Sequence, residues 1–234
     1  SYTYFTWRNT KHELVEYFTE LASIRNYLRP NLWPNTPDIL HEYLQQGGRP
    51  AFLSRVTLAA TLGASYGIYG PAYELLEAAP AAPGSEEYLN SEKYELRDWS
   101  LDDPQSIKGY IARLNAIRRD NPALHSDASL TFLPIDNEEL IAYSKHTDDR
   151  HNIVLTIVNL DPKHAQSGFI QFPLDECGIA PDAHFEAHDL LADVRHRWLG
   201  ARVPVALTPP DCPALIFRLR AQRASTERDF AYYV

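Results

Sequence analysis

The hydrophobic pattern of the chain changes at Ala123. Before this residue, runs of helical periodicity alternate with short β-like runs, which predicts parallel β/α units. After it, short β-rich runs alternate with turn signals, and that spacing is typical of an antiparallel sandwich. We therefore expect an α/β region over residues 1–122, a separate all-β domain over 123–220, and a tail over 221–234 that we cannot assign.

The first region is expected to hold three strands, each followed by helical sequence. Thr10 and Glu13 have the spacing of a capping box, and Asp103 with Pro104 is typical of a helix start. Three such units cannot close a barrel by themselves. The expected elements are a strand at Tyr2–Trp7, a helix through Leu14 and Leu28, a strand around Leu32 and Trp33, a broken helix from Ile39 to Leu62 ended by Gly63, a strand at Ala64–Gly70, a long loop at Pro71–Leu101, and a helix through Ile107 and Ile117 that Asn121 ends.

The second region is expected to hold eight short strands. Its two cysteines, Cys177 and Cys212, are expected to be unpaired thiols, because sparse cysteine in a chain of this size fits a reducing cytosol. The eight expected strands are Leu130–Ile135, Leu140–Lys145, Asn152–Asn159, Gly168–Phe172, His184–Leu190, Val194–Trp198, Val203–Leu207 and Ala214–Leu219.

Charge and hydropathy exclude several classes of protein. The formal net charge of -9 argues against a nucleic-acid partner and against an anionic membrane surface. No run approaches the roughly 20 apolar residues that span a bilayer. The histidines are scattered without metal-ligand spacing, and no glycine-rich phosphate loop is present, so we expect no metal site and no cofactor.

The stretch Asn35-Thr36-Pro37-Asp38-Ile39-Leu40 places a carboxylate between a short apolar run and a helical pattern. Two interpretations stay open on these residues alone. Asp38 is a favoured residue type for the N-cap of the following helix. The alternative is a catalytic carboxylate at the end of a barrel strand, where such side chains face the active-site mouth.

Three motifs carry a resemblance to a known family. Ser-Tyr-Thr-Tyr-Phe-Thr-Trp-Arg at residues 1–8, the Asn35–Leu40 stretch and Asn-Ser-Glu-Lys-Tyr-Glu-Leu-Arg at residues 90–97 closely resemble bacterial α-1,4-glucan:maltose-1-phosphate maltosyltransferases. These are retaining enzymes of the α-amylase superfamily. The resemblance extends to about Leu219. Many amylases have Asn-His-Asp at the second motif, whereas Thr36 and Pro37 here match the narrower family.

The resemblance implies a fold and a set of site residues. The chain would supply the last three β/α units of a (β/α)8 barrel and the C-terminal β-sandwich, while the nucleophile and the acid/base residue would precede Ser1. Asp38 would be the third catalytic carboxylate, which stabilises the transition state. Lys93 and Tyr94 would contact the phosphate of maltose 1-phosphate, although an exposed polar turn is the alternative. Trp7 could line the sugar site or pack beneath the barrel rim.

The expected function is therefore that of the C-terminal portion of a maltosyltransferase. The parent would move maltosyl units from maltose 1-phosphate to the non-reducing end of α-1,4-glucans, in the cytoplasm and as a homodimer, and this portion alone should be inactive. Two alternatives remain: another enzyme of the superfamily, such as a trehalose synthase or an amylase, and a non-catalytic structural or glucan-binding module.

Overall fold

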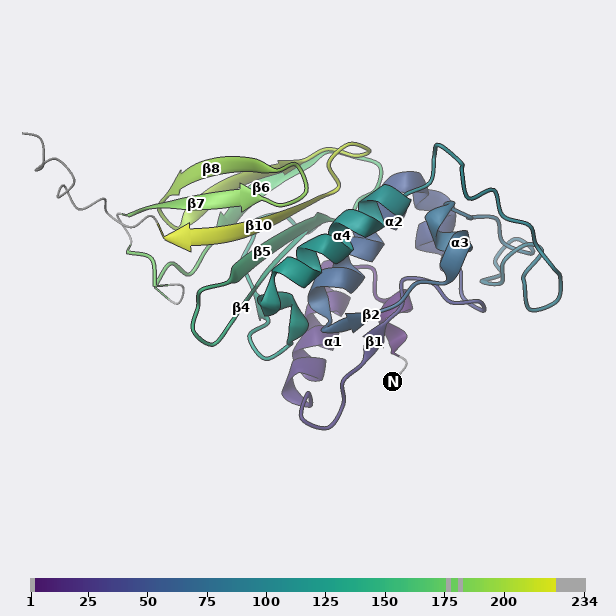
Figure 1. Ribbon diagram of the computed structural model, residues 1–234, viewed down its shortest axis with the longest axis horizontal. Helices are drawn as coiled ribbons and strands as arrows, with labels where there is room; N and C mark the ends of the chain where they lie inside the picture. The colour runs from purple at the N-terminus through teal and green to yellow at the C-terminus, as the bar shows by residue number, and fades with distance from the viewer. Residues whose placement is uncertain (1–2, 176–177, 181–182, 222–234) are drawn as a thin grey trace, which may run out of the picture.

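The computed structural model describes residues 3–175, 178–180 and 183–221. Its first part is mainly helical, and its second part is built from antiparallel strands (Figure 1). Cys177, predicted to be an unpaired thiol, and residues 222–234 of the tail lie outside the described residues. The elements of the first part are η1 (Tyr4–Trp7), α1 (Lys11–Ser23), β1 (Asn31–Leu32), α2 (Glu42–Leu62), β2 (Ser65–Tyr66), α3 (Gly70–Glu74), α4 (Lys108–Asp120) and η2 (Pro122–His125).

The prediction of a strand at residues 2–7 is wrong over its described part, because Tyr4–Trp7 forms a 3-10 turn. The cause is a tertiary contact that propensity does not reveal. The buried Arg55 guanidinium of α2 donates to the carbonyl oxygens of Phe5 at 2.7 Å and Arg8 at 2.6 Å. It also lies 3.9 Å from the centre of the Phe5 ring. These contacts hold the backbone in a bend where aromatic and β-branched residues favour extension.

The other two predicted strands are confirmed but short. β1 pairs in parallel with β2, with Asn31 opposite Ser65 and Leu32 opposite Tyr66. The helical segments between them are also present. The capping box of α1 is confirmed, since Thr10 and Glu13 each accept from the other's backbone N–H. Gly63 ends α2 in an extended conformation.

Two helix starts differ from the prediction. α2 begins at Glu42 with His41 as its N-cap, and the break inside it falls at Gly48, where φ is 58°. α4 begins at Lys108, because the Asp103 carboxylate accepts from Gln105 N at 2.7 Å and forms a separate turn. Polar side chains upstream of a helix thus form hydrogen bonds with nearby backbone groups, as short polar side chains often do.

All eight predicted strands of the second part are confirmed, with ends that shift by a few residues at most. They are β3 (Thr131–Phe132), β4 (Leu140–His146), β5 (Ile153–Asn159), β6 (Gln166–Gln171), β7 (His184–Asp189), β8 (Val194–Leu199), β9 (Arg202–Leu207) and β10 (Ala214–Ala221). One sheet has the order β3-β4-β5-β10-β7-β8, and β6 pairs with β9 in a second. The two sheets enclose a hydrophobic cluster that includes Phe185, Ile170 and Val205.

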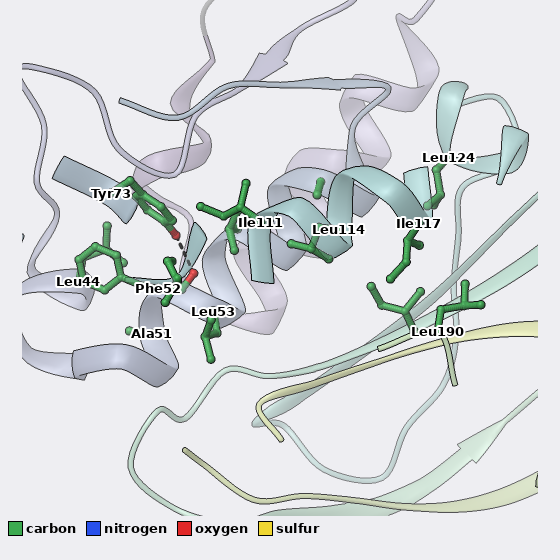
Figure 2. Packing of buried hydrophobic residues seen from close by; sticks show 14 of the residues in the cluster. Leu44, Ala51, Phe52, Leu53, Tyr73, Ile111, Leu114, Ile117, Leu124 and Leu190 are labelled. Atoms are coloured by element: carbon green, nitrogen blue, oxygen red, sulfur yellow. Dashed lines mark hydrogen bonds between the residues drawn. The ribbon is translucent and has the colours of Figure 1, made fainter. Parts of the chain in front are cut away.

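The helical part packs on the outer face of the six-stranded sheet. Leu114 and Ile117 of α4 share a hydrophobic cluster with Ile216 of β10 and with Leu190, which follows β7 (Figure 2). Phe52 of α2 belongs to the same cluster, and the Tyr73 hydroxyl donates to its carbonyl at 2.6 Å. The division at residue 122 stays a prediction, since this cluster draws on both sides of it. In the described part of the chain, no helix is long and apolar enough to cross a bilayer.

Candidate active site

Asp38 lies in a tight turn beyond the end of β1. Thr36 and Ile39 close this turn with reciprocal backbone hydrogen bonds of 3.1 and 3.2 Å. Asp38 N donates to Thr36 Oγ1 at 3.3 Å, so the side chain of Thr36 helps to fix the backbone. Asp38 does not cap α2, because His41 does. Its carboxylate is 61% exposed and is therefore accessible to a ligand.

Lys93 reaches Asp38 from a distant loop. Its ammonium lies 2.5 Å from Asp38 Oδ1 and 3.2 Å from Glu87 Oε1. Hydrogen bonds to these two carboxylates, Asp38 first, raise the pKa of Lys93 above its usual range, so the group is a permanent cation. Tyr94 is 72% exposed, and its ring centre lies 5.2 Å from the same ammonium. The structure thus brings three sequence-predicted positions together: Asp38, Lys93 and Tyr94.

A short hairpin brings two further acids to this place. Ala81 N donates to Glu87 O at 2.8 Å and Leu89 N donates to Ala79 O at 2.9 Å, so residues 79–89 fold back on themselves. This hairpin carries Glu86 and Glu87. Glu87 shares the ammonium of Lys93, and Glu86 accepts from Trp7 Nε1 at 2.9 and 3.0 Å. The Trp7 indole is thus held beside the acidic hairpin.

Asn35 joins the end of β1 to the long loop. It is fully buried, donates from Nδ2 to the Tyr88 hydroxyl at 2.8 Å and accepts from Tyr69 N at 2.9 Å. The Tyr69 hydroxyl in turn donates to Glu92 Oε2 at 2.5 Å, next to Lys93. A buried amide whose donor and acceptor are both used holds its partners firmly. Asn35 therefore fixes the segment that carries Lys93 relative to Asp38.

His41 lies behind Asp38 at the start of α2. Its Nδ1 accepts from Tyr43 N at 3.1 Å and lies 3.3 Å from Asn9 Nδ2. Burial lowers the pKa of His41 below its ordinary value, so the ring is neutral and able to accept at neutral pH. The ring of His41 is thus partly buried and caps a helix.

The sequence did not indicate Glu86, Glu87 or the role of Asn35. The contacts of Glu86 and Asn35 span 79 and 53 residues along the chain, which no local pattern encodes. The one available signal was the pair of adjacent acids shortly before Lys93. Within the described residues, no group of three His, Cys, Asp or Glu side chains is arranged to hold a metal ion.

The arrangement has a definite chemical capacity. An exposed carboxylate such as Asp38 can accept hydrogen bonds from sugar hydroxyls. An ammonium shared by two carboxylates can exchange one of them for an anionic ligand, since all three interactions are charge-assisted hydrogen bonds of the same kind. The site therefore suits a ligand that is hydroxyl-rich at one end and anionic at the other.

Comparison with known proteins identifies the family. Residues 132–219 match the protein family described as "GLGE, C-terminal". The chain is 51% identical over 94% of its length to the α-1,4-glucan:maltose-1-phosphate maltosyltransferase of Chlorobaculum tepidum, of which it covers 34%. It is 47% identical over its whole length to the maltosyltransferase of Myxococcus xanthus, of which it covers 35%. The chain belongs to the α-1,4-glucan:maltose-1-phosphate maltosyltransferase family. It spans about a third of the length of these relatives.

The fold of this chain is similar to part of the fold of α-amylases. It overlays an α-amylase from Anoxybacillus with a TM-score of 0.67, at 14% identity, over 94% of this chain and 45% of that one. An α-amylase from Geobacillus thermoleovorans gives a TM-score of 0.62 at 15% identity, with the same coverage. At such identities the likeness concerns the fold alone.

Proposed function

We propose that the protein containing this chain transfers maltosyl units from maltose 1-phosphate to the non-reducing end of α-1,4-glucans and releases phosphate. Identity of 51% to a protein with this name supports the proposal. The single structural observation that carries it is the contact between Asp38 and Lys93, at 2.5 Å. This contact places a carboxylate that would bind sugar hydroxyls next to a cation that would bind phosphate.

The proposed reaction needs two further acids. A carboxylate nucleophile attacks the anomeric carbon while the bond to the phosphate oxygen breaks, which leaves a covalent maltosyl-enzyme and free phosphate. The acceptor hydroxyl then attacks the same carbon, its proton goes to the acid/base residue, and the nucleophile is released. We place both acids upstream of this chain. Asp38 would hold ring hydroxyls through hydrogen bonds that strengthen as positive charge develops in the transition state.

Phosphate is both part of the donor and the leaving group. Lys93 would supply a point charge to it and Tyr94 a hydroxyl donor. The Trp7 indole, held beside Glu86, would border the sugar site, since aromatic faces make large apolar contacts. In this proposal residues 1–122 form barrel units six to eight, and residues 123–220 form the C-terminal β-sandwich. The parent would be a homodimer in the cytoplasm.

The test is phosphate release by the full-length protein. It would be incubated with maltose 1-phosphate and a malto-oligosaccharide, and Asp38→Asn should lower kcat by a factor on the order of 100 to 1,000. Asp98→Asn, at an exposed position in the loop that carries Lys93, is the control and should leave the rate unchanged. Release of trehalose or reducing sugar without any dependence on phosphate would instead indicate another enzyme of the superfamily. This chain alone should release no phosphate.

A further inference from the structure

A group of arginines gathers on the outer face of the sheet, away from the candidate active site. Arg195 and Arg197 alternate on β8, and Arg218 and Arg220 alternate on β10. Residues two apart on a strand face the same side of a sheet. Ile216, two residues before Arg218, packs in the cluster that contains α4, so these even-numbered positions of β10 face outward.

The register across β7 places all four guanidinium groups on one face. Arg218 pairs with His188, which pairs with Arg195 on the other side. Arg220 pairs with Glu186, which pairs with Arg197. With strands about 4.8 Å apart and residues about 3.4 Å apart, the four Cα atoms stand at the corners of a rectangle of about 10 by 7 Å. β10, β7 and β8 lie side by side at the end of the sheet opposite β3 (Figure 1).

Two buried polar atoms in this face have no hydrogen-bond partner among the described residues. His188 is 7% exposed, and its Nδ1 makes no hydrogen bond to any described residue. Arg218 Nε is buried and equally unsatisfied within the described chain. The two residues face each other across β10 and β7. Buried polar groups normally have partners, so each unsatisfied one needs an explanation, and a bound ion is one such explanation.

The charges around the face do not cancel. Glu186 Oε1 lies 2.6 Å from Arg195, and Asp193 Oδ1 lies 2.6 Å from His188 Nε2. Asp120 at the end of α4 is close enough to interact with Arg218. Neither Arg197 nor Arg220 has an ion pair in the part of the chain that the structure describes. Burial and the neighbouring arginines, Arg220 and Arg195, lower the pKa of Arg218, so the positive charges are crowded.

We propose that the face formed by Arg195, Arg197, Arg218 and Arg220, with His188 between them, binds a ligand that carries two or more phosphate groups. The four arginines stand two strands or two residues apart on one face, so their like charges repel one another, and an anion laid between them reduces that repulsion. One carboxylate offers only two acceptor oxygens to four guanidinium groups, each of which has five N–H donors. Successive phosphates offer planar guanidinium groups several bidentate contacts.

The experiment measures binding of inorganic pyrophosphate to the full-length protein by calorimetry at low salt. The double variant Arg197→Gln, Arg220→Gln should raise Kd at least about tenfold, because each position removes a charge-assisted contact. Both side chains are exposed, so the fold should be unaffected. Lys163→Gln, an exposed cation in the loop after β5, is the matched control and should leave Kd unchanged.

Lys93 is itself proposed to contact phosphate, so the titration is repeated with Lys93→Met. Binding that persists in Lys93→Met and is lost in the double variant belongs to the sheet face, whatever the fate of the proposed function. Binding lost in Lys93→Met and kept in the double variant would overturn the inference. So would the absence of pyrophosphate binding at millimolar concentration, including the case in which polyglutamate binds instead, which would indicate an acidic protein partner.

Discussion

At the scale of single residues, the candidate active site depends on which groups contact the Lys93 ammonium. Two carboxylates, Asp38 and Glu87, share its ammonium at 2.5 and 3.2 Å. Only Asp38 was indicated by the sequence, because Glu87 belongs to a loop without periodicity. An incoming phosphate must compete with both acids for the same donors. In the proposed function, Glu87 would therefore be an obstacle to the anionic end of the substrate, whereas Asp38 would bind its sugar end.

Replacement of Glu87 by Gln should ease this competition. It removes one negative charge near the phosphate and keeps the size of the side chain, so we expect the KM for maltose 1-phosphate to fall a few-fold while kcat changes little. Initial rates of phosphate release by the full-length protein would measure both constants. Glu95→Gln in the same loop is the control. A raised KM in Glu87→Gln would show that this carboxylate helps to place Lys93 instead.

At the scale of elements, the N-terminus of α2 depends on a neutral imidazole. His41 Nδ1 must be unprotonated to accept from Tyr43 N, and burial lowers the pKa of His41 below the ordinary 6.5. A histidine whose folded pKa is lowered binds its proton more readily in the unfolded chain. The stability from this cap is therefore present above pH 6.5 and is lost as the pH falls through the folded pKa.

The variant His41→Asn tests this pH dependence. Asn is a good N-cap residue that does not titrate, so the melting temperature should fall less between pH 7 and pH 5 than in the unsubstituted protein. Thermal unfolding of the full-length protein in matched buffers measures the difference. His151→Asn, at an exposed turn, should keep the original pH profile. Identical profiles for His41→Asn and the unsubstituted protein would exclude His41 as the titrating cap.

The elements also show which parts of this fold a sequence can predict. The eight antiparallel strands follow one another along the chain, so turns and alternation define them locally. β1 and β2 have two residues each and pair in parallel across 34 positions, which leaves little local pattern. Residues 4–7 have strand-forming side chains, but they form a 3-10 turn to which the distant Arg55 donates a hydrogen bond. In the site, Asp38 and Lys93 were found through motif resemblance, whereas the contacts of Asn35 and Glu86 depend on the folded loop.

At the scale of the whole molecule, the helical and β parts share hydrophobic clusters. Leu114 of α4 is fully buried against a cluster that includes Val154 and Ile216 of the sheet. A second cluster combines Phe18 of α1 with Val158 of β5. Two parts that share buried residues in this way should lose their structure together.

Leu114→Ala measures that coupling. A cavity at a fully buried leucine should lower the free energy of unfolding by about 2 to 5 kcal/mol. We expect one calorimetric transition that moves to lower temperature as a whole. Leu101→Ala, at a side chain that is 55% exposed, should change stability by less than about 0.5 kcal/mol. Two separate transitions, only one of them shifted, would show that the helical and β parts unfold independently.

The two hydrogen bonds of the buried Asn35 side chain limit how this scaffold can be re-engineered. A chimaera that grafts the long loop of another enzyme between β2 and α4 must carry an aromatic hydroxyl at the position of Tyr88, or the buried amide loses its acceptor. A graft with phenylalanine there would still cover the same apolar surface. Its lysine, however, would no longer be held against Asp38, and the hybrid would fold without the contact on which the proposed function rests.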